Sequence, residues 1–147
     1  MRGVGGWLLL LCFGLTVFSP ILVGIGIVRG YFADSPHFAT FPRLRAVFFV
    51  DVALRLALTA YGVYAGLRLG LVRPRAVQTA KTYFACAAGY LVIGALLPFA
   101  AGLPPAADPA LAQAAVEQTV PALISVGIWY AYLVRSQRVK ATYPDAP

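Results

Sequence analysis

Residues 128–140 read IWYAYLVRSQRVK, an apolar run that stops at Val134 and a basic run that begins at Arg135. Such a change is typical of the place where a membrane-spanning helix leaves the lipid, because Lys and Arg collect at the cytoplasmic ends of these helices. Apolar residues extend back from this edge far enough to cross a hydrocarbon core of about 30 Å. The sequence therefore predicts a membrane helix that ends at Val134.

The composition also indicates a membrane protein. Of the 147 residues, 61% are hydrophobic and 12% are charged, whereas about 25% of an ordinary soluble domain is charged. The formal net charge of +7 would suggest nucleic acid as the partner of a soluble protein. Here the Lys and Arg residues stand at the ends of apolar stretches rather than along one face, so no nucleic-acid binding is expected.

Four apolar stretches predict an all-α integral membrane protein, a single four-transmembrane-helix bundle. The spans cover residues 5–28, 46–67, 82–103 and 113–134, and a basic cytoplasmic tail follows at 135–147. The first stretch is longer than the 7–15 apolar residues of a secretory signal, and no small-x-small cleavage site follows it. An uncleaved membrane span is therefore expected there.

Prolines predict how these helices begin and bend. Ser19-Pro20 lies inside the first span and predicts a kink, because Pro lacks a backbone donor. Asp108-Pro109 reads as an N-cap with Pro at the first helical position, so the fourth helix is expected to begin there and Pro121 to bend it. The last residues, 143–147, are expected to be a mobile tail.

The distribution of basic residues predicts the orientation of the bundle. One side holds Arg2, Arg68, Arg73, Arg75, Lys81, Arg135, Arg138 and Lys140, and the other holds Arg29, Arg43 and Arg45 beside Asp34, Asp108 and Glu117. Both termini are therefore expected in the cytoplasm. Cys12 and Cys86 fall in the cytoplasmic halves of their spans, where thiols stay reduced, so no disulfide is expected.

Motifs at the two ends of the chain carry a family resemblance. GGWLLL at residues 5–10 is followed by Ser19-Pro20, and residues 128–143 read IWYAYLVRSQRVKATY. Together they resemble a bacterial family known as domain of unknown function 2569. The positions that carry the resemblance are Gly6, Trp7, Ser19, Pro20, Trp129, Ser136, Arg138 and Lys140, with Val139, Ala141 and Thr142 also matching.

This resemblance implies a small, four-span protein of the bacterial inner (cytoplasmic) membrane, and it implies no activity. The chain departs from the family at two positions near its end. Ala131 stands where many members have proline, and Tyr143 stands where they have phenylalanine. The bend of the tail is therefore expected to differ from that of other members.

Two charged residues, Asp51 and Arg55, lie deep inside the second predicted span. They are four positions apart, so they are neighbours on a helix and are expected to pair. Arg55 lies about 15 Å below Arg45, close to mid-membrane, where an unpaired Arg costs about 2.5–3.5 kcal/mol on insertion scales. The carboxylate reduces this cost, but the pair must still be shielded from lipid.

Helical periodicity places the pair on an inward face of its helix. That face holds Asp51, Arg55, Thr59, Gly62 and Gly66, and the opposite face holds Phe49, Ala53, Leu56, Ala60 and Leu67. Gly62, Gly66 and Gly70 form two overlapping Gly-x-x-x-Gly steps, which allow close helix packing, more often within one chain than between two copies. Hydroxyl partners for the pair are expected among Thr16, Ser19, Tyr90 and Ser125.

Two interpretations of Asp51 and Arg55 remain open. The pair is either a structural clamp that fixes the rotation of its helix, or part of a polar pocket or a proton or solute path. The chain is accordingly expected to be a non-enzymatic component that associates with lipids, with another membrane protein or with a second copy. The alternative is a small oligomeric transporter or proton-conducting protein.

No catalytic residue, cofactor or metal site is expected, because no phosphate-binding loop, Ser/His/Asp set or carboxylate pair can be assembled. His37 is the only histidine, and with Asp34 it supplies too few ligands for a metal. Glu117 is expected either to be solvated or to pair with Arg43 or Arg45.

Overall fold

The computed structural model describes residues 6–35, 39, 42–100 and 109–143, and in this part of the chain every regular element is helical. The elements are α1 (Trp7–Phe13), the π-helical turn η1 (Gly14–Phe18), α2 (Ser19–Asp34), α3 (Pro42–Gly70), α4 (Ala76–Ala100), α5 (Pro109–Arg135) and α6 (Gln137–Thr142). The start of α5 at Pro109 agrees with the position predicted from the proline, whereas Asp108 lies outside the described residues.

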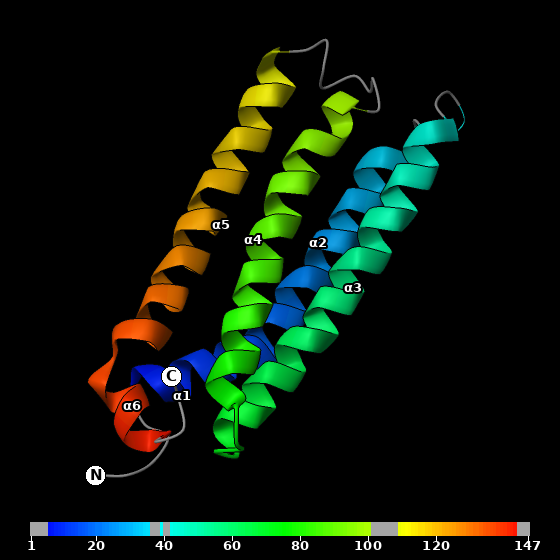
Figure 1. Cartoon of the computed structure of the whole chain (residues 1–147). Helices are drawn as coiled ribbons and strands as arrows, with labels where there is room; N and C mark the ends of the chain where they lie inside the picture. Colours follow the sequence, from blue (N-terminus) through cyan, green and yellow to red (C-terminus); the bar gives the residue numbers. More distant parts are fainter. Residues whose placement is uncertain (1–5, 36–38, 40–41, 101–108, 144–147) are drawn as a thin grey trace.

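The four long helices α2, α3, α4 and α5 run alternately up and down beside one another (Figure 1). α3 packs against α2, η1 and α4, and α5 packs against α4. α1, α6 and the turn between α3 and α4 lie together at one end of the molecule (Figure 1). This arrangement is the antiparallel order that short connections between successive membrane helices produce.

Three helical stretches are long and apolar enough to cross a membrane, namely Trp7–Phe32, Arg45–Gly70 and Ala76–Leu96. A fourth apolar stretch, Thr119–Arg135, is shorter. The prediction of an all-helical protein is therefore confirmed, and three to four of its helices are candidate membrane spans.

The first predicted span is broken at a π-helical turn. The ring of Pro20 crowds the carbonyl of Thr16, four residues earlier, and Pro20 donates no hydrogen bond to it. The chain relaxes by the wider turn of η1 just before this point, and α1 and α2 run in different directions (Figure 1). The Thr16 hydroxyl donates to the Cys12 carbonyl, 2.8 Å away, and so satisfies one backbone acceptor at the break.

The basic turn between α3 and α4 is held by Arg68. Its guanidinium donates to the Pro74 carbonyl (2.5 Å) and to the Thr79 hydroxyl (3.4 Å), and it lies over the Tyr64 ring. Val72 and Arg75 have φ values of 50° and 59°, which are uncommon for residues with side chains. Arg68 therefore fixes a tight turn whose backbone is strained.

All buried residues lie in one half of the molecule. Its largest fully buried side chains are Leu8, Leu69, Leu133, Val77 and Val139. Every described residue in 16–61 and in 88–132 is partly or fully exposed. We call the part built from residues 6–15, 62–87 and 133–143 the closed half, and the part built from residues 16–61 and 88–132 the open half.

The C-terminal segment that follows α5 completes the closed half. Ser136 caps α6 by accepting a hydrogen bond from the Val139 amide, and Val139 is 0% exposed. Tyr143, predicted to begin a mobile tail, is buried, and its hydroxyl donates to the Leu69 carbonyl at the end of α3. Residues 144–147 lie outside the described residues.

Candidate functional site

Three side chains form a closed polar cycle in the open half, which we call the triad. Arg55 Nε lies 2.7 Å from Asp51 Oδ2 and donates to the Tyr90 hydroxyl oxygen, 2.9 Å away. The Tyr90 hydroxyl in turn donates to Asp51 Oδ1 at 2.5 Å. The pairing predicted from the four-residue spacing is therefore present, and Tyr90 ties it to the next helix.

The backbone of α3 and α4 sets this geometry. Asp51 and Arg55 lie one turn apart on α3, and Tyr90 comes from the neighbouring part of α4. The Thr59 hydroxyl donates to the Arg55 carbonyl (2.7 Å), one turn further along the same face. On the other side, a Cβ built on Gly26 of α2 would lie 3.8 Å from Arg55 Nη1, so the backbone of α2 lies close to the guanidinium.

The triad is only partly shielded. The Arg55 side chain is 40% exposed and the Asp51 side chain 21% exposed. Within the part of the chain that the structure describes, Nη1 and Nη2 of Arg55 have no hydrogen-bond partner. The inward placement of the pair is therefore incomplete, because the guanidinium keeps a free edge at the depth of the apolar helices.

Of the four hydroxyls predicted as partners, Tyr90 alone joins the pair among the described contacts. Thr16 bonds within its own helix, and Ser19 lies at the Tyr83 hydroxyl in the closed half. Ser125 is exposed on α5 and forms no described hydrogen bond. The depth of these groups was predictable from their positions in the spans, but the rotation of their helices was not.

The inward glycine face of α3 is confirmed for two of its three glycines. A Cβ on Gly62 would lie 2.9 Å from the Tyr83 ring, and a Cβ on Gly66 would lie 2.8 Å from Thr16 Cγ2. A Cβ on Gly70 would meet nothing within 4 Å, so the prediction that Gly70 packs a helix is wrong within this chain. The residues predicted for the opposite face, Phe49, Ala53, Leu56, Ala60 and Leu67, are all exposed.

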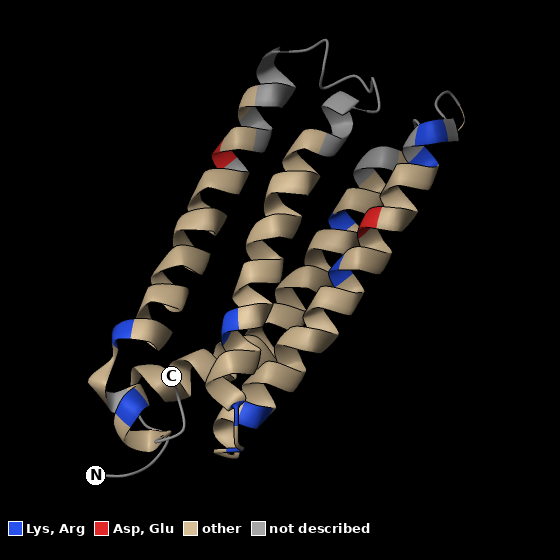
Figure 2. Cartoon of the chain, in the orientation of Figure 1, with Lys and Arg blue, Asp and Glu red and all other residues tan. Residues whose placement is uncertain are grey.

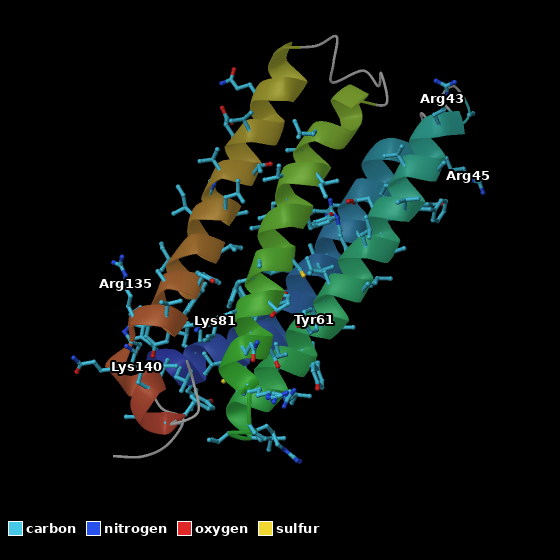
Figure 3. All side chains as sticks on the ribbon, in the orientation of Figure 1. Arg43, Arg45, Tyr61, Lys81, Arg135 and Lys140 are labelled. Atoms are coloured by element: carbon cyan, nitrogen blue, oxygen red, sulfur yellow. The ribbon has the colours of Figure 1, made fainter. Side chains whose placement is uncertain are left out.

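Basic residues gather at the end that holds the closed half. Arg135, Lys140 and Lys81 lie there, whereas Arg43 and Arg45 lie at the far end of α3 (Figure 3). Figure 2 shows acidic residues only in the open half of the described chain. This asymmetry agrees with the two sides predicted from the sequence.

The motif residues at the two ends of the chain meet at the border of the closed half, where Trp129 and Tyr132 pack against its buried core. The rings of Trp7 and Trp129 lie 6.3 Å apart, and Trp129 also packs edge-on against Tyr132. Burial raises the pKa of Tyr143 above its ordinary value, so its hydroxyl keeps the proton that it donates to Leu69. The side chain of Arg138 is not among those described.

The remaining candidates form no site among the described residues. Glu117 accepts a hydrogen bond from Gln113 (2.9 Å) and has no described ion pair with Arg43 or Arg45. His37 lies outside the described residues, and no described group of His, Cys, Asp or Glu could hold a metal ion. Cys12 and Cys86 are free thiols.

Sequence reasoning missed the contact of the C-terminal segment with the closed half. One signal was available, because Ser136 followed three positions later by a hydrophobic residue is compatible with a helix N-cap. The burial of Val139 and Tyr143 had no such signal, since two apolar residues among charged ones do not show which surface they contact.

A family model described as a protein of unknown function, DUF2569, matches residues 1–144. The chain therefore belongs to this family over essentially its whole length. Comparison with curated proteins and with solved structures found no match.

Proposed function

We propose that this member of the DUF2569 family is a non-enzymatic protein of the bacterial inner membrane that acts by associating with another membrane component through its open half. It would span the membrane four times, with both termini in the cytoplasm. The predominance of Lys and Arg at the end that holds the closed half supports this orientation.

The observation that carries the proposal is the partly exposed triad among apolar helices. Apolar side chains that face lipid need no further cover, but an arginine at that depth does. The cost of an uncovered Arg is about 2.5–3.5 kcal/mol on insertion scales, and Asp51 offsets only part of it. A second membrane component packed over Arg55 would remove the remaining free-energy cost. Covering the open half would therefore stabilise the protein in the membrane.

The alternative function is a transporter or proton path, and one observation favours it. Asp51, Arg55 and Tyr90 bring three ionisable groups to one depth. The closed half argues against a proton or solute path through a single copy. Leu15, Leu69 and Phe84 belong to one buried apolar cluster, which lies between the triad and the basic end of the molecule. We therefore expect purified protein in liposomes to give no proton flux above that of empty vesicles.

Photo-crosslinking in native membranes tests the association. A photoreactive residue at Ile93 on α4, which is 59% exposed in the open half, should give a constant adduct with one component. The matched control is Leu10 on α1, 50% exposed in the closed half, which should give only scattered lipid adducts. Equal adducts at both positions would count against association through the open half.

A mutant cycle measures the structural share of the triad. Asp51→Ala should lower the amount of protein in the membrane, because it leaves Arg55 without its carboxylate. Adding Arg55→Ala should restore that amount if the pair acts only as a clamp. If the double variant accumulates normally but loses its Ile93 adduct, the triad is part of the association site.

A further inference from the structure

The free edge of Arg55 is shaped for an anion. A guanidinium offers five N–H donors in a plane, and Nη1 and Nη2 together can hold two oxygens of one phosphate or carboxylate. In the triad, Asp51 and Tyr90 both engage Nε. Nη1 lies beside Gly26 of α2, 3.8 Å from where a Cβ would be, and no described hydrogen bond engages Nη1 or Nη2.

Arg55 lies at a depth where its side chain can reach a lipid head group that is displaced slightly from the membrane surface toward the hydrocarbon core. Arg55 precedes Arg68, which holds the turn at the basic end, by 13 positions on α3, or about 20 Å of helix. Since the hydrocarbon core is about 30 Å thick and Arg45 lies about 15 Å from Arg55, roughly 10–15 Å separates the Arg55 backbone from the opposite surface. The side chain reaches toward Asp51 and hence toward that surface, as a snorkelling arginine does.

The charges around this opening favour a negative partner. Arg29 on α2 is exposed, and no described residue forms a hydrogen bond or ion pair with it. Arg43 and Arg45 are exposed at the start of α3. Among the described side chains of α2 and of this part of α3, Asp51 is the one carboxylate, and Arg55 and Tyr90 already engage it.

We propose that Arg55 binds the phosphate of an anionic phospholipid, which enters the open half sideways from the leaflet nearest the start of α3. Nη1 and Nη2 donate to two phosphate oxygens, and the acyl chains lie along the exposed apolar residues of the open half. This inference rests on the proposed function and names the associated component as a lipid. A protein partner, whether a second copy of the chain or another membrane protein, would need an acidic residue that reaches Nη1 and Nη2 of Arg55.

Native mass spectrometry of the purified full-length protein in detergent tests the site with two probes. Phosphatidylglycerol should bind more tightly than diacylglycerol with the same acyl chains, which lacks the phosphate. Asp51→Asn should keep this preference, because it leaves Arg55 in place. The double variant Asp51→Asn with Arg55→Gln leaves neither charge behind. It should raise the dissociation constant of the first bound phosphatidylglycerol about tenfold, as expected for loss of a charge-assisted hydrogen-bond pair.

Arg73→Gln is the matched control, since it removes one exposed positive charge from the basic turn. It should change the first binding constant by less than about threefold, because exposed single charges contribute about 1 kcal/mol or less. The proposal is overturned if the double variant binds phosphatidylglycerol as the wild type does. It is also overturned if Arg73→Gln weakens binding equally, or if both probes bind alike.

The adduct at Ile93 separates this inference from the proposed function. A lipid adduct that disappears in the double variant supports both. A constant protein adduct, including one with a second copy, keeps the proposed function and overturns the lipid site. Absence of any constant adduct, together with proton flux in liposomes, overturns the proposed function itself.

Discussion

The closed and open halves are built from the same four helices, yet different interactions hold them. In the closed half, glycines let helices touch, and leucines, valines and aromatic rings fill the space between them. In the open half no described residue is fully buried, and a triad of three polar side chains joins α3 to α4. Packing therefore fixes one half, whereas the other depends on a few polar contacts and on what covers it.

This difference assigns distinct roles along each helix. α3 carries its close-packing glycines toward its C-terminal end and its charged pair toward its N-terminal end. Overpacking in the closed half should thus lower global stability most, whereas the loss of one hydrogen bond in either half should loosen only the helices that it joins. The three predictions below test that separation.

Gly66→Leu should have the largest effect. Its Cβ would lie 2.8 Å from Thr16 Cγ2, 2.9 Å from Leu15 Cβ and 3.3 Å from the Cys12 carbonyl oxygen. Two of these are side-chain atoms next to the backbone of η1 and the third is a backbone oxygen of α1, so overpacking should cost roughly 3 kcal/mol. Thermal unfolding in detergent measures it, with Gly70→Leu as the control, since Gly70 has no neighbour within 4 Å. Equal losses from the two variants would contradict close packing at Gly66.

Tyr90→Phe should loosen the open half with a smaller effect. It removes one donor to Asp51 and one acceptor from Arg55, while their direct contact remains. The cost should be about 1.5 kcal/mol, the low end for hydrogen bonds to charged groups, because the triad is partly exposed. Hydrogen exchange should rise in residues 88–96 but not in residues 76–87. Tyr130→Phe, at an exposed ring with no described partner, is the control.

Tyr143→Phe should have the smallest effect, about 1 kcal/mol for one lost hydrogen bond. It should raise hydrogen exchange in α6 and leave the triad unchanged. Because burial raises the pKa of Tyr143, the hydroxyl stabilises the fold fully below the ordinary value of 10.0 and loses this effect as pH rises through the raised pKa. The wild type should therefore lose α6 protection at high pH, and the variant should change less. Equal pH profiles would contradict a stabilising role for this hydroxyl.

The sequence predicted the features that depend on local spacing. The apolar stretches predicted the helices, and the four-residue spacing predicted the contact between Asp51 and Arg55. Periodicity also predicted which face of α3 turns inward, since Gly62 is buried and Leu56 is exposed. Each of these follows from the geometry of one helix.

Features that depend on how two or more helices pack could not be predicted from the sequence in this way. The choice of Tyr90 over Ser19 as the partner of the pair depends on how far α2 and α4 rotate about their axes. The docking of α6 depends on a site formed by α1 and the end of α3, which no local pattern displays. Gly70 had the right spacing for packing, but α3 ends there before another helix reaches it.

The contact between Trp7 and Trp129 bears on how the protein is made. The closed half combines residues of α1 with residues of α6, which are synthesised after all the helices between them. Helices α2 to α4 can therefore enter the membrane during translation, but the core that holds them together closes only after α6 has left the ribosome. Until then the nascent chain is a set of helices whose shared core still lacks Leu133, Val139 and Tyr143.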